Sequence, residues 1–231
     1  GNSPVVGQVD AALTALKAGK HIDVTTMNPA LAKGLFNPKV QNFLIDSFRL
    51  DPAALAETLV AAGLPVIEVT LRTPWALDAL HTMAGVTGAV VGAGTVRDPN
   101  MLDEAIGAGA QFIVSPGLTE PLGRAAIASR VPFLPGIATA GDIMRGLDMG
   151  LSRFKFFPAE ASGGRPALKA LSGPFPELRF CPTGGVRLEN AADWLALEAV
   201  SCVGGTWIAG PHDSDLAAIG ARARAAAAVG R

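Results

Sequence analysis

Residues 153–160 read Arg153-Phe154-Lys155-Phe156-Phe157-Pro158-Ala159-Glu160, a stretch typical of a short buried strand that a proline ends. Side chains alternate between the two faces of a strand, so Lys155 points away from Phe154 and Phe156. Burial disfavours the charged form of a lysine, and a partly neutral lysine can attack a carbonyl substrate. The alternative is a structural lysine that reaches water or pairs with a carboxylate, and this stretch alone favours that alternative.

Apolar segments of this kind recur along the chain at intervals of roughly 20–25 residues, with helical segments between them. The expected strands are residues 40–45, 66–70, 89–92, 111–114, 131–134, 153–157, 178–181 and 199–203. Dipeptides such as Asp51-Pro52 and Asp98-Pro99 open helical segments, because aspartate caps a helix and proline suits its first turn. Alternating β and α segments indicate a parallel sheet covered by helices, and eight such units predict a closed (β/α)8 TIM barrel.

An open doubly wound sheet is the alternative arrangement, and it normally has fewer strands and the fingerprint GxGxxG. Gly92-Ala93-Gly94 begins that fingerprint, but Arg97 stands in the place of the last glycine. At the front of the chain, apolar positions at helical spacing predict an additional N-terminal helix over residues 5–18, followed by an irregular segment. We therefore expect one (β/α)8 barrel domain over residues 1–231, with residues 1–39 preceding the first strand.

The composition narrows the class of protein. The chain has 231 residues, of which 49% are hydrophobic, and a net charge of −1 without a basic run, so we expect no nucleic-acid or membrane-surface partner. No apolar run is long enough to span a bilayer and no signal peptide opens the chain, which predicts a cytoplasmic protein. The two cysteines and three histidines show no metal-ligand spacing, so we expect reduced thiols, no metal and no cofactor.

The active site of such a barrel lies at the C-terminal ends of the strands. Glu68 alternates with apolar neighbours and faces the interior, either as a proton-transfer group or in a structural ion pair with Lys155 or Arg72. Arg72 follows that strand and can hold a substrate carboxylate through two parallel hydrogen bonds, although a surface arginine is the alternative. Thr95 and Pro116 follow the next two strands and offer a hydroxyl and an apolar wall, or simply form turns.

Two glycine pairs follow the last two strands, in Pro182-Thr183-Gly184-Gly185-Val186 and Gly204-Gly205-Thr206-Trp207. In (β/α)8 enzymes these two loops often bind phosphate through glycine amides and a helix N-terminus. Thr183 or Thr206 would add a hydroxyl donor, and the alternative is that both loops are tight turns. A phosphate site, Glu68 and Lys155 would meet at one rim of the barrel, which makes a functional role for Lys155 the better interpretation.

Five segments of the chain resemble the 2-keto-3-deoxy-6-phosphogluconate (KDPG) aldolase family. They are Ile67–Thr73, Val91–Val96, Ser115–Pro121, Phe154–Glu160 and Phe180–Gly185. The resemblance is collinear from about residue 53 to residue 207, whereas residues 20–48 depart from the family pattern. It implies a class I aldolase of the Entner–Doudoroff pathway, a homotrimer of (β/α)8 barrels that often also cleaves 4-hydroxy-2-oxoglutarate.

Carried over to this chain, the resemblance implies a phosphorylated keto-acid substrate, with Lys155 as the Schiff-base lysine and Glu68 as the acid and base. It assigns the pyruvate carboxylate to Arg72 and Thr95, the pocket walls to Pro116 and Phe157, and the phosphate to Gly184, Gly185 and Thr206, where the family commonly has serine. Other functions stay open: an aldolase for the galactonate epimer, a metal-free sugar-phosphate isomerase, and a non-catalytic barrel that binds a phosphorylated metabolite.

Overall fold

The computed structural model describes residues 42–45, 50–210 and 213–229, which belong to the compact unit Pro38–Arg231. The helix predicted for residues 5–18 and the irregular segment predicted for residues 20–39 lie outside the described residues. The assignment of residues 1–231 to a single domain therefore stays a prediction.

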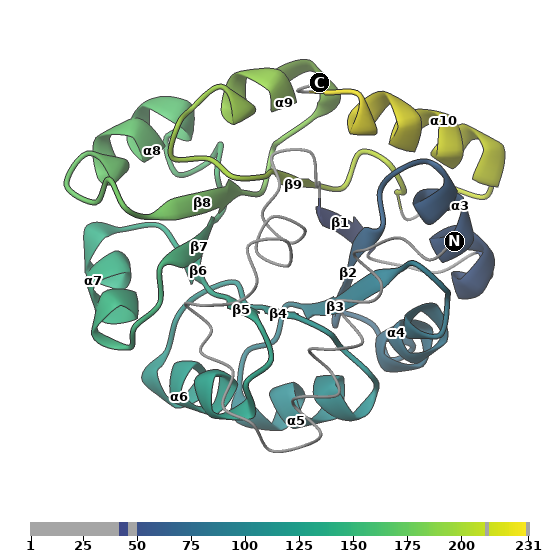
Figure 1. Cartoon of the computed structure of the whole chain (residues 1–231), viewed down its shortest axis with the longest axis horizontal. Coiled ribbons are helices and arrows are strands. Elements are labelled where there is room, and N and C mark those ends of the chain that lie inside the picture. The colour runs from purple at the N-terminus through teal and green to yellow at the C-terminus, as the bar shows by residue number, and fades with distance from the viewer. Residues whose placement is uncertain (1–41, 46–49, 211–212, 230–231) are drawn as a thin grey trace, which may run out of the picture. The chain divides into compact units, whose positions relative to one another are not determined.

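The strands of this unit are all parallel and close into a ring. They are β1 (Asn42–Ile45), β2 (Val66–Thr70), β3 (Val90–Gly94), β4 (Ile113–Val114), β5 (Phe133–Leu134), β6 (Gly136–Ile137), β7 (Arg153–Phe156), β8 (Arg179–Pro182) and β9 (Gly204–Gly205). They pair in the orders β5-β4-β3-β2-β1-β9 and β6-β7-β8. Pro135 alone separates β5 from β6, and a parallel bridge between Thr183 and Gly204 joins β8 to β9. Counting β5 and β6 as one broken strand gives the eight-stranded barrel that the sequence predicts (Figure 1).

The helices lie outside this ring, as Figure 1 shows. They are α3 (Pro52–Ala61), α4 (Ala76–Ala84), α5 (Pro99–Gly107), α6 (Glu120–Ser129), α7 (Ala140–Asp148), α8 (Gly164–Ser172), α9 (Leu188–Leu195) and α10 (Leu216–Ala227). The Asp-Pro signals work as expected, because the Asp51 carboxylate accepts a hydrogen bond from the amide of Ala53 and Asp98 accepts one from Met101. Both helices therefore begin where the capping residue predicts.

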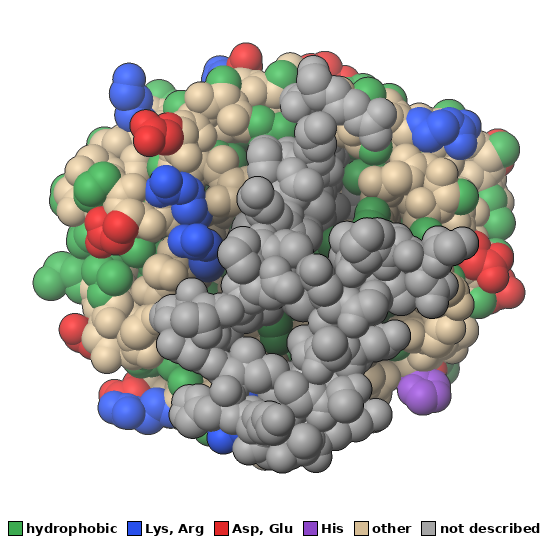
Figure 2. Space-filling view, viewed as in Figure 1, with side chains coloured by type: hydrophobic (Ala, Val, Ile, Leu, Met, Phe, Trp, Pro, Cys, Tyr) green, Lys and Arg blue, Asp and Glu red, His purple; other side chains and the backbone are tan. Residues whose placement is uncertain are grey.

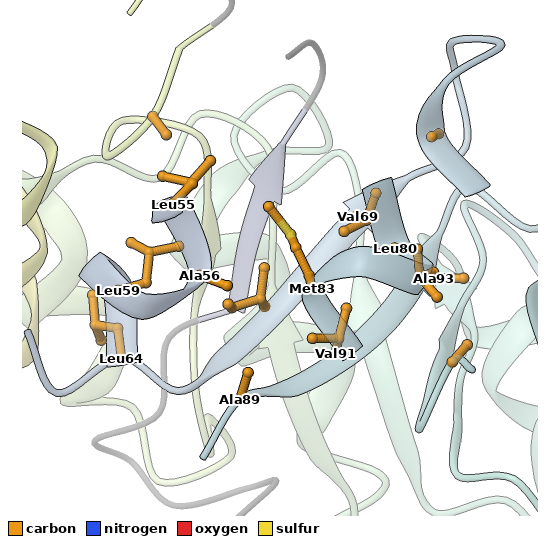
Figure 3. Close-up of a cluster of buried hydrophobic side chains, with 14 of the residues drawn as sticks. Leu55, Ala56, Leu59, Leu64, Val69, Leu80, Met83, Ala89, Val91 and Ala93 are labelled. Atoms are coloured by element: carbon orange, nitrogen blue, oxygen red, sulfur yellow. The ribbon is translucent and has the colours of Figure 1, made fainter. Parts of the chain in front are cut away.

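The hydrophobic core lies between the ring and the helices. Figure 3 shows Leu55 and Leu59 of α3, Met83 of α4, and Val69 and Val91 of the sheet as parts of one buried cluster between helices and strands. Burying one large apolar side chain of this kind stabilises the folded barrel by roughly 1.5–3 kcal/mol. Because Val69 faces outward, its neighbours along β2 face the barrel interior.

A second cluster covers the outer face of β7. Phe154 and Phe156 are fully buried and pack with Ile143 of α7, Leu168 of α8 and Trp194 of α9. The rings of Phe156 and Trp194 have centroids 6.3 Å apart. The two phenylalanines therefore point to the helices, as the alternation of the strand predicts, and Lys155 points inward.

One strand prediction is wrong in its position. The sequence predicts the last strand over residues 199–203, but Val200 makes only an isolated bridge with Phe180, and the ladder to β1 lies at Gly204–Gly205. Glycine is depleted in strands, so the pattern of β-branched residues could not locate this ladder. Close packing explains the glycine, because a Cβ on Gly204 would lie 2.5 Å from Thr183 Oγ1.

On the described surface in Figure 2, acidic and basic side chains are intermixed, in agreement with the small net charge. The helices within the described residues are too short or too polar to serve as a membrane span. In the same part of the chain no group of three or more His, Cys, Asp and Glu side chains is placed to hold a metal ion.

Candidate active site

Lys155 and Glu68 form an ion pair inside the barrel. The Nζ atom of Lys155 lies 3.4 Å from Oε1 of Glu68, and the two residues are 5% and 1% exposed. In the ring of eight strands, three strands separate β2 from β7 in either direction, so the pair spans the interior. The sequence predicts that both side chains face the interior, and the structure brings them together.

Gly94 makes room for the Glu68 carboxylate. A Cβ on Gly94 would overlap Oε1 of Glu68 and lie 2.7 Å from its Cγ, so no larger residue fits here without moving the carboxylate. In the sequence, Gly92-Ala93-Gly94 is the start of an incomplete GxGxxG fingerprint and part of a family-like segment, and neither pattern predicts this role. The signal that could have revealed this role is the parallel register of β2 and β3, in which Glu68 pairs with Gly92 and Thr70 pairs with Gly94.

Phe157 lies beside the lysine. The ammonium nitrogen of Lys155 is 5.1 Å from the centroid of the Phe157 ring, within the range of a cation–π interaction. The amide of Phe157 donates to the carbonyl of Ile137 at 3.1 Å, and the peptide bond to Pro158 is cis. Phe157 is thus the first residue past the strand, next to the nitrogen proposed to react.

The predicted carboxylate-binding and wall residues lie in three consecutive loops of the same rim. Arg72 follows β2, Thr95 follows β3 and Pro116 follows β4, and these strands are neighbours. Thr95 has φ of 63°, a left-handed conformation that costs a β-branched residue about 1–3 kcal/mol. Strain of this kind is common at binding sites.

The loop after β8 runs beside β9, because Thr183 makes a parallel bridge with Gly204. Gly184 and Gly185 have φ of 98° and 81°, conformations that glycine adopts without strain. Gly205 instead allows a close approach, because a Cβ there would overlap the ring of Trp207. The turn at Gly184–Gly185 is therefore the stronger candidate for binding an anion through backbone amides.

The two threonines of these loops differ in exposure. Thr183 is buried, and its hydroxyl donates to the carbonyl of Cys181 at 3.4 Å, whereas Thr206 is exposed. Thr206 is the hydroxyl that is open to a ligand, and Thr183 lies at the interior surface just above Cys181.

Two buried thiols lie in this half of the barrel, Cys181 on β8 and Cys202 before β9. A hydrogen bond with Cys181 and burial both raise the pKa of Cys202 well above its usual value of 9.0. The Cys202 thiol therefore stays protonated and reacts slowly. Lys155 is therefore the candidate nucleophile of this interior, with a carboxylate neighbour that can exchange a proton with it.

The chain matches the model of a protein family described as "Aldolase: KDPG and KHG aldolase", and the match covers residues 43–221. A 2-dehydro-3-deoxy-phosphogluconate aldolase of Zymomonas mobilis is 53% identical over 181 residues, which cover 78% of this chain and 87% of that protein. A KHG/KDPG aldolase of Escherichia coli is 55% identical over 155 residues, 67% of this chain and 73% of that protein.

The fold agrees with a solved structure of the same kind. The KDPG aldolase of Legionella pneumophila, with pyruvate captured as a covalent carbinolamine intermediate, superposes with a TM-score of 0.79 at 41% identity. The superposition covers 83% of this chain and 96% of that one. A carbinolamine forms when an amine attacks the carbonyl of pyruvate, which is a reaction that a buried lysine beside a carboxylate can perform.

Proposed function

The chain belongs to the KDPG and KHG aldolase family, and we propose that it cleaves 2-keto-3-deoxy-6-phosphogluconate into pyruvate and glyceraldehyde 3-phosphate through a Schiff base on Lys155. The observation that carries this proposal is the buried pair of Lys155 and Glu68, which supplies a nucleophile and a proton carrier 3.4 Å apart. The enzyme is a lyase of the class I type, which needs an amine and no metal ion.

In the reaction, Lys155 gives its proton to Glu68 and attacks the C2 ketone of the substrate. Loss of water leaves an iminium, which draws electrons from the C3–C4 bond when the C4 hydroxyl is deprotonated. Glyceraldehyde 3-phosphate leaves, and the remaining enamine is protonated and hydrolysed to pyruvate. Glu68 carries these protons, directly or through a bound water, because it is the carboxylate in contact with Lys155.

The other predicted residues bind the two ends of the substrate. Arg72 and Thr95 hold the pyruvate carboxylate, which suits a guanidinium and a hydroxyl on neighbouring loops. Pro116 and Phe157 line the apolar part of the pocket. Gly184, Gly185 and Thr206, with Thr183 beneath them, bind the phosphate, and the left-handed glycines support this role.

We further propose that the enzyme also cleaves 4-hydroxy-2-oxoglutarate, in keeping with the E. coli relative, which is a KHG/KDPG aldolase. The homotrimer and the cytoplasmic location stay predictions made from the sequence. Size-exclusion chromatography with light scattering tests the first of these two, and fractionation of the native host tests the second.

Trapping with borohydride tests the mechanism. Borohydride in the presence of pyruvate should reduce the imine and leave a stable adduct on Lys155, which mass spectrometry of peptides locates. Lys155→Ala should abolish the adduct and the activity, whereas Lys169→Ala, at an exposed position of α8, should change neither. An adduct on another residue, or turnover without one, as expected for an isomerase, would contradict the proposal.

A further inference from the structure

We propose that Glu160 is a positioning residue that holds the Gly184–Gly185 turn in the shape that binds the phosphate of the substrate. This inference rests on the proposed function, which assigns the phosphate to that turn. Glu160 lies in the loop after β7, five residues beyond Lys155. Its side chain points to the loop after β8 and to α9.

The carboxylate of Glu160 is fixed by two donors from α9. Its Oε1 atom accepts hydrogen bonds from Nε1 of Trp194 at 3.0 Å and from Nδ2 of Asn190 at 3.2 Å. Trp194 is fully buried in the core cluster, so its indole N–H is a rigid anchor. Glu160 is an exposed residue whose one oxygen is nevertheless tied to the interior of the molecule.

Asn190 connects this carboxylate to the turn. Its Nδ2 also donates to the carbonyl of Gly185 at 3.2 Å, and its Oδ1 accepts from the amide of Arg187 at 2.8 Å. The side-chain amide of Asn190 thus forms hydrogen bonds with the backbone on both sides of Val186. Because one carboxylate oxygen and two backbone groups orient Asn190, losing the carboxylate removes one of the three hydrogen bonds that hold its side chain.

The backbone of Glu160 and the methylene groups that form the stem of its side chain also contact the Gly184–Gly185 turn. The amide of Glu160 donates to the carbonyl of Gly184 at 3.0 Å, and the amide of Ala159 donates to that of Thr183 at 2.7 Å. A Cβ on Gly185 would lie 2.5 Å from Cγ of Glu160, so the stem lies directly against the glycine. The loop that follows Lys155 and Phe157 is therefore fastened to the glycine turn through its backbone, its stem and its carboxylate.

The sign of the effect separates positioning from plain electrostatics. A carboxylate near a phosphate repels it, so if Glu160 acted only by its charge, its removal would tighten binding of the phosphorylated substrate. A positioning residue has the opposite effect, because the turn loses its binding shape. We expect Glu160→Ala to raise the KM for KDPG by about tenfold or more, the range for losing hydrogen bonds to a charged group.

A comparison of two substrates separates positioning from a general loss of structure. KDPG carries the phosphate and 4-hydroxy-2-oxoglutarate does not, while both react at Lys155. With Glu160→Ala, kcat/KM for 4-hydroxy-2-oxoglutarate should stay within about twofold of the unmodified enzyme, because no hydrogen bond to that substrate is lost. Trapping of pyruvate by borohydride should be unchanged as well. Glu160→Gln keeps an acceptor oxygen, so its KM for KDPG should be close to that of the unmodified enzyme.

The matched control is Glu189→Ala, which removes the same charge from an exposed position in the first turn of α9. It should not raise the KM for KDPG. Asn190→Ala should reproduce the selective defect, and it decides the question if Glu160→Ala does not fold. Equal losses with both substrates, or a KM for KDPG that is unchanged or lower, would overturn the role of Glu160. Failure of the unmodified enzyme to trap pyruvate or to cleave KDPG would overturn the proposed function itself.

Discussion

Lys155 and Glu68, 87 residues apart in sequence, meet at 3.4 Å across the interior of the barrel. Each is the counter-charge of the other at a buried position, so removing one leaves a buried charge without its partner. The pair stabilises the charged lysine in the folded protein, and in the proposed mechanism it also provides the route by which the lysine proton leaves. Substitutions at either position should be designed to separate these roles.

Glu68→Gln tests the proton-transfer role. Glutamine has nearly the same shape and keeps a polar atom beside Lys155, but it cannot carry a proton between steps. The kcat for KDPG cleavage should fall by about 10²–10⁴-fold, the usual contribution of a general acid and base. Steady-state kinetics measure the loss, and circular dichroism checks that the barrel still folds. A kcat close to that of the unmodified enzyme would remove Glu68 from the mechanism.

Gly94→Ala should reduce activity without touching a reacting atom. The new methyl group would overlap Oε1 of Glu68, so the carboxylate must turn away from Lys155. We expect a loss of kcat similar in direction to that of Glu68→Gln. Gly107→Ala is the control, because its Cβ meets nothing within 4 Å and it lies at the end of α5. If both variants kept full activity, the carboxylate would not need its present position.

A series at Thr95 separates backbone strain from the hydroxyl. Thr95→Ser keeps the hydroxyl and should keep the affinity for pyruvate, whereas Thr95→Ala and Thr95→Gly should both weaken it. Glycine accepts the φ of 63° without strain, so the free energy of unfolding of Thr95→Gly should exceed that of Thr95→Ala by about 1 kcal/mol. Rates of borohydride trapping at several pyruvate concentrations measure affinity, and urea titrations measure stability. Equal affinity in all three variants would exclude a role for the hydroxyl.

Asp142 should make the stability of the barrel depend on acidity. Burial alone would raise its pKa, but hydrogen bonds from the Thr139 hydroxyl, from the amides of Ala138 and Thr139, and from Arg145 outweigh burial and lower the pKa below 3.8. The lowered value means that the carboxylate stabilises the fold above pH 3.8, and that this contribution is lost as the pH falls through the folded-state pKa.

Comparison with Asp142→Asn checks this sign. The unmodified protein should be more stable than Asp142→Asn near neutral pH, by about 1 kcal/mol, because a neutral amide oxygen accepts weaker hydrogen bonds than a carboxylate, and the gap should close on acidification. Urea titrations of both proteins at a series of pH values measure it. A gap that stays constant down to pH 3.8 and well below it would show that the carboxylate does not titrate with folding.

Local patterns predicted most of the elements. The bounds of β2, residues 66–70, follow from its apolar residues, and the helices that begin at Pro52 and Pro99 follow from the aspartate before each. Local patterns failed at Gly204–Gly205, where the strand consists of glycines that are required by the side chains of Thr183 and Trp207. The contact between Thr183 and Gly204 joins segments far apart in the sequence, so no short window of sequence contains both partners.

The same limit explains why Gly94 and Glu160 escaped the sequence interpretation. Gly94 is needed because Glu68, on the neighbouring strand, occupies the space where a side chain would be. Glu160 acts through Asn190 and Trp194, which lie 30 and 34 residues further along the chain. Their importance depends on which residues the fold places beside them, and not on their own residue types.

By itself, the sequence determined that the chain alternates strands and helices, and that Lys155 lies on the opposite face of its strand from Phe154 and Phe156. Both follow from local periodicity, since hydrophobic residues bury themselves against the helices and the remaining side chain turns inward. The sequence also predicts that Glu68 and Lys155 meet at one rim of the barrel, but only the tertiary structure decided that they lie 3.4 Å apart. Closing the ring places β2 directly opposite β7, and that placement depends on the pairing of every strand between them.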